Sequence, residues 1–471
     1  MYNIRTLFAL GVVLMLVTCE CLTSGQYQSP GWGMMDSILN QIQEPQFPER
    51  VVQIKRAVPD LEDHDYSESI NRAIQNISEL GGGTVLIPEG IYHTGPIRLL
   101  DNVRIHLEEG AELRFSTDPS DYLPVVQTRW EGIDCYNYRP LIYAAHAENV
   151  AITGKGILNG MAGPDDWWPW KGREDYGYEE GDPSQLDQGS RPRLEEFNEK
   201  QVPVDERIFG TGSYLRPQFI HFFQCRNILI EDVTIIRSPF WLIHPLLCEN
   251  IIMRRVTMES SGPNNDGCDP ESSRNMLIED CFFNTGDDCI AIKSGRNQDG
   301  RRWNIPSENI VIRNCTMHNG HGGVVIGSEV SGGCRNIFAE NTVMDSPGLQ
   351  RAIRIKTNTQ RGGVIENIFV RNIKVGQVDE AVLRINCHYD SNKEGEGEFM
   401  PCIRNIHLVN VESRESRRSL YLEGVEGAKS ICDIFVVDCN FNGVKSDPVI
   451  SDVTNLVAEN TFVNEKRVDR F

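Results

Sequence analysis

The amino-acid sequence predicts an all-β protein folded as a right-handed parallel β-helix, and two observations lead to this prediction. A motif of Asn followed by apolar, often β-branched residues recurs roughly every 22 to 38 residues, an interval typical of solenoids. Clear copies begin at Asn227, Asn250, Asn275 and Asn309. Each repeat also consists of short β-rich runs between Gly and polar residues, without the 3.6-residue period of a helix.

The Asn that begins each run suits a turn between strands. Asn tolerates left-handed backbone geometry and can bond to its own main chain. Stacked in register, successive Asn side chains could also bond one another as a ladder. A β-sandwich or a propeller with unrelated Asn turns is the alternative, although those folds seldom combine so irregular a period with so constant a motif. Further copies begin at Asn149, Asn336, Asn367, Asn405 and Asn455.

The first predicted elements close one end of the solenoid. Residues 66–80 are the clearest helical segment, with Asp65 or Ser67 as the candidate cap at its start and Gly81 directly after its end. The apolar face of this helix consists of Ile70, Ala73, Ile74 and Ile77. The run 84–88 then starts the first coil. We expect the helix to cover the open end, which would otherwise expose core and strand edges.

The N-terminus has the pattern of an export signal. Arg5 supplies a positive start, and residues 7–17 form an apolar run too short to span a bilayer. Cys19 also fits a lipoprotein processing site, although Thr18 is unusual immediately before it. Ordinary cleavage and lipid anchoring both place the protein outside the cytoplasm: secreted, periplasmic or anchored at the cell envelope.

We therefore expect three parts in the chain: a signal at 1–21, a linker at 22–50 and a single β-helix domain at 51–471. One stretch of this domain, residues 161–215, departs from the repeat and is predicted to be an insertion on a loop face. It contains Trp167, Trp168 and Trp170. These side chains could stack on sugar rings or could instead pin the loop itself.

The net charge restricts the classes of binding partner, and the cysteines bear on disulfides and metal binding. The formal net charge of -21 argues against nucleic acid and anionic membranes, and no stretch after the signal is apolar enough to span a membrane. A polyanionic substrate would need local cations. The 14 Cys would suggest disulfides in an exported chain, but several of them lie beside the Asn motif, which equally fits buried residues stacked from coil to coil. No spacing indicates zinc, and we expect neither metal nor cofactor.

Four polar motifs follow one another at intervals close to one coil. The step is 22 residues from Asp266 to Asp288, 33 to His321 and 33 again to Arg354. Because coils lie about 4.8 Å apart, the motifs would form one row of roughly 14 Å, enough for two or three sugars. The motifs are Asn264-Asn265-Asp266-Gly267, Gly286-Asp287-Asp288-Cys289, Gly320-His321-Gly322 and Arg354-Ile355-Lys356.

Such a row could hydrolyse a glycosidic bond. Asp266, Asp287 and Asp288 would repel one another, which raises the pKa of at least one of them. An acid beside a carboxylate suits an inverting hydrolase, with a separation of about 6.5 to 9.5 Å to admit water. Arg354 and Lys356 point to one side of a strand and suit a carboxylated sugar. Taken singly, each motif is more often a turn, a calcium-ligand pair or an exposed strand.

The four motifs in this order resemble those of the polygalacturonases of glycoside hydrolase family 28, which usually have Thr where this chain has Asn265. The resemblance extends over about residues 52–462. It implies that Asp287 is the general acid, that Asp266 and Asp288 hold the water and act as base, and that His321 orients them. It assigns carboxylate binding to Arg354 and Lys356. Further substrate-binding candidates are Asn264, Tyr389, Trp241 and His244.

The resemblance also bears on Cys289, whose family partner lies four residues before the His. That position is Met317 here, so a disulfide is not expected. The function implied is hydrolysis of α-1,4-galacturonosidic bonds in the pectin of plant cell walls by an exported monomer. The insertion and the segment 264–302 favour exo action. Rhamnogalacturonan hydrolysis, a calcium-dependent pectate lyase and a non-catalytic carbohydrate-binding β-helix are the alternatives.

Overall fold

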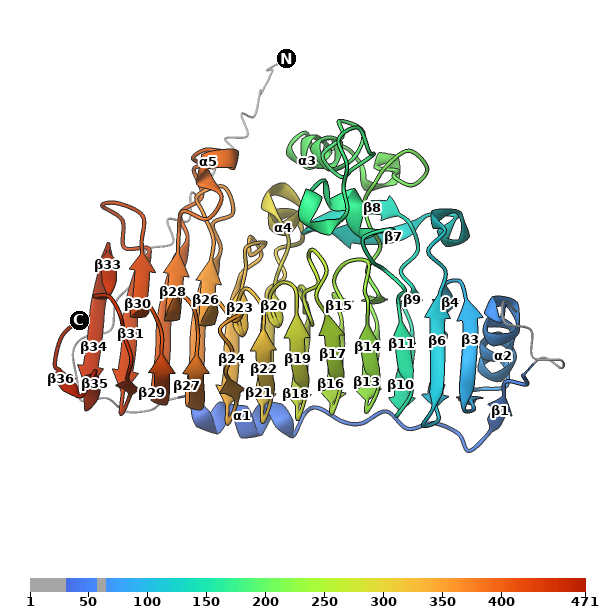
Figure 1. Cartoon of the computed structure of the whole chain (residues 1–471), viewed down its shortest axis with the longest axis horizontal. Helices are drawn as coiled ribbons and strands as arrows, with labels where there is room; N and C mark the ends of the chain where they lie inside the picture. The colour runs from blue at the N-terminus through green and yellow to red at the C-terminus, as the bar shows by residue number, and fades with distance from the viewer. Residues whose placement is uncertain (1–30, 57–64) are drawn as a thin grey trace, which may run out of the picture.

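A computed structural model describes residues 31–56 and 65–471, so the predicted signal and Cys19 lie outside the described residues. The chain winds into a right-handed parallel β-helix, as predicted, with most of the loops gathered along the upper edge in Figure 1. In the described residues, no helix is long and apolar enough to cross a membrane. Three columns of stacked strands form the faces of the coils.

The first two columns belong to one large sheet. The first column contains β2 (Gly83–Ile87), β5 (Val103–Leu107), β10 (Glu148–Gly154), β13 (Arg226–Glu231), β16 (Glu249–Arg254), β18 (Arg274–Glu279), β21 (Ser307–Arg313), β24 (Cys334–Glu340), β27 (Val364–Gln377), β29 (Cys402–Glu415), β31 (Ile431–Val437) and β34 (Val453–Glu459). The second contains β3 (Gly90–Thr94), β6 (Ala111–Phe115), β11 (Ile157–Asn159), β14 (Thr234–Ile236), β17 (Thr257–Ser260), β19 (Phe282–Thr285), β22 (Thr316–Asn319), β25 (Val343–Met344), β32 (Asn440–Phe441) and β35 (Thr461–Val463).

The third column supports the loops. It contains β4 (Ile97–Arg98), β9 (Ile142–Ala145), β12 (Ile220–Phe223), β15 (Ile243–Leu246), β20 (Ile290–Ile292), β23 (Val324–Ile326), β26 (Arg351–Lys356), β28 (Ala381–Asn386), β30 (Arg418–Glu423) and β33 (Val449–Ser451). Cys268 bridges β15 to β20, which makes this column continuous. Above it stands an antiparallel hairpin of β7 (Val126–Trp130) and β8 (Ile133–Asn137), together with the 3₁₀ turns η1 (Pro119–Tyr122), η2 (Trp168–Lys171), η3 (Glu174–Tyr176) and η4 (Val204–Glu206).

The ends of the solenoid are covered. Helix α2 (Ser67–Glu79) caps the N-terminal end and buries the predicted apolar face, and the Asp65 carboxylate accepts the Ser67 N–H at 2.8 Å. Strand β1 (Val51–Gln53) extends the sheet beside β2, while β36 (Lys466–Val468) folds back antiparallel on β35. The other helices are α3 (Arg191–Glu199), α4 (Asn297–Trp303) and α5 (Ser391–Glu394).

The Asn ladder exists as predicted. Asn336 donates to Asn309 at 3.0 Å and accepts from Asn367 at 3.0 Å, and all three residues have positive φ near 60°. Buried apolar residues stack in the same register inside the coils, for example Ile310 on Ile337 and Ile337 on Ile368. The cysteines of residues 31–56 and 65–471 are all buried free thiols, which confirms the stacking interpretation over disulfides.

The segment expected to be a linker is partly structured. Helix α1 (Trp32–Leu39) lies along the outside of the first column in Figure 1 and buries Met35 and Ile38 against Phe338 and Phe369. No local sequence pattern predicts this contact, because the aromatic residues that pack against the helix face outward from strands more than 290 residues later.

Candidate active site

The four motifs lie on consecutive coils, as their spacing predicts. The residues that follow or flank them pair across the third column: Cys268 with Ile290, Ile290 with Val324 and Val324 with Ile353. Gly267, Gly320 and Gly322 permit close approach of these coils. A side chain at position 320 would meet the Asp287 carbonyl oxygen at 2.5 Å, and Gly320 also has a φ of +145°.

Asp266, Asp287 and Asp288 converge as one cluster. Each offers a carboxylate oxygen, and these three oxygens lie within 4.8 Å of one another. The separation of 6.5 to 9.5 Å expected for inversion is therefore wrong for these oxygens. Adjacent coils set the spacing, and they are closer together than two independent loops would be.

Asp287 and His321 form a hydrogen-bonded pair. The His321 Nδ1 atom lies 2.8 Å from Asp287 Oδ1, and Asp287, with 18% of its side chain exposed, is the most accessible carboxylate of the cluster. Burial alone would raise the pKa of Asp287, but the charge and hydrogen bond of His321 outweigh it and hold that pKa low. The Asp287 carboxylate in turn raises the pKa of His321. The pair therefore retains one proton to higher pH than a free imidazole.

Asp266 and Asp269, buried beneath this pair, also favour their protonated forms. Burial raises the pKa of Asp266 well above its ordinary value, and the carboxylates of Asp269 and Asp287 raise it further. Burial also raises the pKa of Asp269, against the opposing charge of Lys293. The prediction that mutual repulsion raises at least one pKa is thus confirmed, with burial as the larger cause. Lys293 Nζ lies 3.5 Å from Asp269 and 3.8 Å from Asp266.

Asp288 contacts both cations of the fourth motif. Lys356 Nζ donates to it at 2.6 Å and Arg354 Nη1 lies 3.5 Å away. Both cations pack over the Tyr389 ring, at 5.2 and 5.4 Å from its centroid. Lys356 and Tyr389 line the cavity, whereas Arg354 lies behind them, 9% exposed. Arg354 thus orients the carboxylate and the aromatic ring.

The cluster forms the floor of a cavity of about 410 Å³. Five carboxylates line it: Glu131, Asp266, Asp287, Glu329 and Asp390. Eight cations outnumber them, so the cavity is positive although the whole chain carries -21. This arrangement supplies the local cations that an anionic substrate requires. They are Lys171, Arg173, Arg191, Lys293, Arg296, Lys356, Arg361 and Lys393.

The insertion lines one side of the cavity, as expected, but not through its tryptophans. Trp167 is buried in the main core, Trp168 donates its Nε1–H to the Ser238 carbonyl at 2.9 Å, and Trp170 packs against Trp167. Their role is to pin the loop. The insertion instead presents Lys171, whose Nζ donates to Asn264 Oδ1 at 2.6 Å.

The structure changes the interpretation of two residues that were predicted to bind substrate, His244 and Trp241. His244 is fully buried, with Nε2 at 2.9 Å from Glu271, so its assignment as a substrate contact is wrong. Trp241 lines the cavity, yet only 2% of it is exposed, and the Lys293 ammonium lies 4.5 Å from its ring centroid. Both residues lie close to the motifs in sequence, but His244 lies in strand β15 and points into the protein interior, whereas Trp241 precedes that strand and reaches the cavity.

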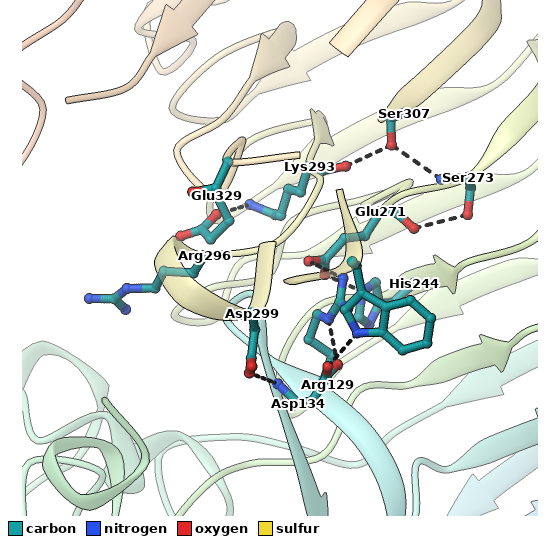
Figure 2. Close-up of polar contacts among 12 residues, drawn as sticks. Arg129, Asp134, His244, Glu271, Ser273, Lys293, Arg296, Asp299, Ser307 and Glu329 are labelled. Carbon is teal, nitrogen blue, oxygen red and sulfur yellow. Dashed lines mark hydrogen bonds and ion pairs between the residues drawn. The ribbon is translucent and has the colours of Figure 1, made fainter. Parts of the chain in front are cut away.

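His244 belongs to a buried charged network that sequence analysis missed (Figure 2). Arg129 of β7 donates to Asp134 of β8 at 2.8 Å and to Glu271 at 3.1 Å. Asp134 accepts from the indole of Trp303 at 2.6 Å, and its own N–H donates to Asp299 at 2.9 Å. This network fixes the β7–β8 hairpin upon the coils. Its partners lie up to 169 residues apart in the sequence, so no local sequence pattern predicts these contacts.

The hairpin tip crosses the top of the cavity. Its two-residue turn, Glu131-Gly132, has positive φ at both positions, as a tight hairpin requires. The Gly132 carbonyl accepts the Arg296 N–H at 2.9 Å, and Glu131 pairs with Arg191 of the insertion at 3.0 Å. The hairpin and the insertion therefore close one end of the cavity together. Gly132 between two β-rich runs was the only available sequence signal.

The three clustered Asp oxygens are also the atoms that could hold a hard cation. His321, Lys293 and Lys356 already contact or approach these carboxylates and balance their charge. The donor set is therefore built for protons and for an anionic sugar. No step of the reaction below involves a metal.

A parallel β-helix with clustered carboxylates on the floor of a cation-lined cavity defines the protein as a carbohydrate hydrolase. Residues 210–460 match the sequence profile of the glycosyl hydrolases family 28, and the chain belongs to that family. It is thus a glycoside hydrolase. Its membership agrees with the motif order found in the sequence.

Known relatives resemble the chain over most of its length. A solved exopolygalacturonase from Thermotoga maritima is 45% identical, with a TM-score of 0.87, and the alignment covers 93% of this chain and 97% of the other. A "Probable polygalacturonase" of Vitis vinifera is 27% identical over 76% of this chain and 67% of its own length. The exo-poly-alpha-D-galacturonosidase of Dickeya chrysanthemi is 26% identical over 68% of this chain and 54% of its own length.

Proposed function

We propose that the protein removes terminal sugars from homogalacturonan by inverting hydrolysis of α-1,4-galacturonosidic bonds. The observation that carries this proposal is the closed, cationic cavity over three carboxylates. A cavity sealed at one end by the hairpin and the insertion suits a chain terminus rather than the middle of a polymer. The 45% identity to an exopolygalacturonase supports the same conclusion.

Asp287 is the proton donor in this proposal because it is the accessible carboxylate. In the free enzyme its proton rests largely on His321, 2.8 Å away. A bound sugar excludes water, which favours the neutral pair over the ion pair and moves the proton to Asp287. Asp287 then protonates the departing glycosidic oxygen. Asp288, which accepts a hydrogen bond from Lys356, acts as the base toward water, and Asp266 holds that water beside it.

Carboxylate recognition falls to the cations of the cavity. Lys356 and Tyr389 receive the sugar on one side of the scissile bond, and Lys171 and Arg173 of the insertion receive the terminal sugar on the other. Asn264 positions Lys171. We further propose that the chain is exported and acts on pectin outside the cytoplasm, as the N-terminal pattern indicates.

Product analysis tests the proposal directly. The protein is incubated with homogalacturonan and, in parallel, with rhamnogalacturonan, while NMR follows anomeric configuration and chromatography follows product size. We expect galacturonic acid as the first product from homogalacturonan, released as the β-anomer. Release of the α-anomer would exclude inversion, mixed oligomers at early times would exclude exo action, and ultraviolet absorbance from unsaturated products would indicate a lyase.

A further inference from the structure

A second cavity lies beyond the closed end of the active site. It has a volume of about 470 Å³ and is lined from two directions. Arg98 of β4 and Tyr143 of β9 are register partners on the third strand column. Gln127 and Tyr136, paired across the β7–β8 hairpin, form the opposite side. The hairpin therefore separates two cavities, with Glu131 at its tip facing the active site and its base facing the second cavity.

Two guanidinium groups dominate the charge of this second cavity. Among residues 31–56 and 65–471, no carboxylate forms an ion pair with Arg98 or Arg139. The Nε–H of Arg139 donates to the Pro124 carbonyl at 3.1 Å, which leaves its two terminal nitrogens directed elsewhere. Burial and the charge of Arg98 both lower the pKa of Arg139, so the two cations are near enough to repel. Because the chain carries a net charge of -21, two neighbouring cations without an ion-pair partner, Arg98 and Arg139, favour the binding of an anion.

The remaining lining suits a sugar. Tyr143 and Tyr136 offer aromatic surface, and Tyr143 is fixed by stacking on His221 at an interplanar angle of 5°. Gln127 adds an amide to the lining, whereas the Asn71 amide is engaged with backbone groups of Ser67, Pro96 and Arg98. A guanidinium group binds a carboxylate in two-pronged geometry. Aromatic rings, amides and guanidinium groups together are the groups that recognise an acidic sugar.

We infer that the cavity of Arg98, Arg139, Tyr136 and Tyr143 is a second binding site for an anionic polysaccharide, one that takes a segment of polyuronate separate from the chain being cleaved. It is not a continuation of the catalytic cavity, because the two cavities share no lining residue. The identity of the uronate rests on the proposed function. The site tethers the enzyme to polymer while a chain end enters the catalytic cavity.

Binding and kinetics test the inference separately. In the inactive Asp287→Asn protein, titration calorimetry with hexagalacturonate should show two sites per chain. Adding Arg98→Gln and Arg139→Gln should leave one. In the active protein the same pair should raise KM for polygalacturonate about tenfold, with kcat/KM for digalacturonate unchanged. The control pair Arg226→Gln and Arg274→Gln, on exposed strand starts of the large sheet, removes equal charge and should change neither.

Each outcome has a distinct meaning. One site in the Asp287→Asn protein, or an unchanged KM for polymer in the arginine double variant, overturns the second site. A change in mass by sedimentation in that variant identifies the surface as an interface between copies and also overturns it. If the wild-type protein cleaves no galacturonan but binds two hexagalacturonates in an arginine-dependent way, the proposed function fails and the second site stands.

Discussion

The large outer sheet and the catalytic cavity are built from the same coils on different principles. In the outer sheet a polar group meets its own counterpart one coil away, as Asn336 meets Asn309 and Asn367. In and beneath the cavity, unlike groups from distant segments meet, as Arg129 meets Glu271 after 142 residues. The repeat thus builds a uniform support, and departures from the repeat build the site.

The outer sheet mainly supports the stability of the fold, whereas the cavity carries the catalytic groups. Bonds in the ladder are identical, redundant and neutral, so losing one weakens the solenoid locally. The cavity concentrates buried charges that favour catalysis and oppose folding unless each is balanced. Substitutions in the two regions should therefore have opposite signatures.

Removing the proton donor should give the largest effect. In Asp287→Asn, kcat on polygalacturonate should fall by about 10²- to 10⁴-fold, because the amide cannot protonate the leaving oxygen. Thermal stability should change little, since the loss of the ion pair with His321 is offset by relief of repulsion from Asp266. Circular dichroism melts and initial rates of sugar release measure the two quantities. Unchanged activity would remove Asp287 from the mechanism.

His321 should control the alkaline side of the pH profile. Its raised pKa keeps the Asp287–His321 pair protonated at acidic pH, and activity should fall as pH rises through that pKa. His321→Asn keeps a hydrogen-bond donor near Asp287 but cannot titrate. We expect kcat to fall on the order of 10²-fold and the alkaline limb to disappear. A variant that keeps the wild-type limb would assign it to another group.

Lys171 tests whether the insertion that lines the cavity binds substrate. Burial lowers the pKa of Lys171 to about 8, and its ammonium donates to Asn264 at the cavity wall. Lys171→Met should raise KM for short oligogalacturonates about tenfold with little change in kcat. Lys200→Met, at the exposed end of α3, is the matched control and should behave as wild type. Equal KM values for Lys171→Met and Lys200→Met would show that the insertion limits the cavity sterically and does not bind substrate.

The contrast between the two regions also explains what the sequence could predict. The outer sheet was predictable because its rule repeats: Asn149, Asn227 and their successors mark most turns, and Asp433 takes the same position in one coil. The catalytic row was predictable because each motif occupies one phase of one coil. The hairpin with Glu131 and the placement of His244 were not predictable, because long-range pairs such as Asp134 with Trp303 fix them and leave no period in the sequence.

One ladder residue should show the opposite signature to Asp287. Asn336 has a φ of 58° and bonds to the Asn residues above and below it. Asn336→Ala should cost roughly 2 kcal/mol of unfolding free energy, from left-handed strain and lost hydrogen bonds, with kcat unchanged. Asn336→Gly removes the bonds without the strain and should cost less. If both variants lose activity rather than stability, the two regions are not separable.

The smallest expected effect is a dependence of stability on pH that originates under the cavity. Burial raises the pKa of Glu271 to about 7, and those of Asp266 and Asp269 are also raised. The folded protein therefore holds protons that the unfolded chain releases above its ordinary carboxyl pKa, so stability decreases as pH rises from about 4.5 through 7. His321 acts in the same direction. Burial lowers the pKa of His221, His244 and His407, and these groups act in the opposite direction below about pH 6.5. The contribution of the acids is therefore measured between pH 6.5 and pH 8, where we expect Tm to fall by a few degrees. Glu271→Gln, which keeps hydrogen-bonding atoms near Arg129 and His244, should flatten this slope, whereas Asn336→Gly should lower Tm equally at both pH values. A wild-type Tm that is the same at pH 6.5 and pH 8 would show that Arg129 and Lys293 keep these acids ionised in the folded protein.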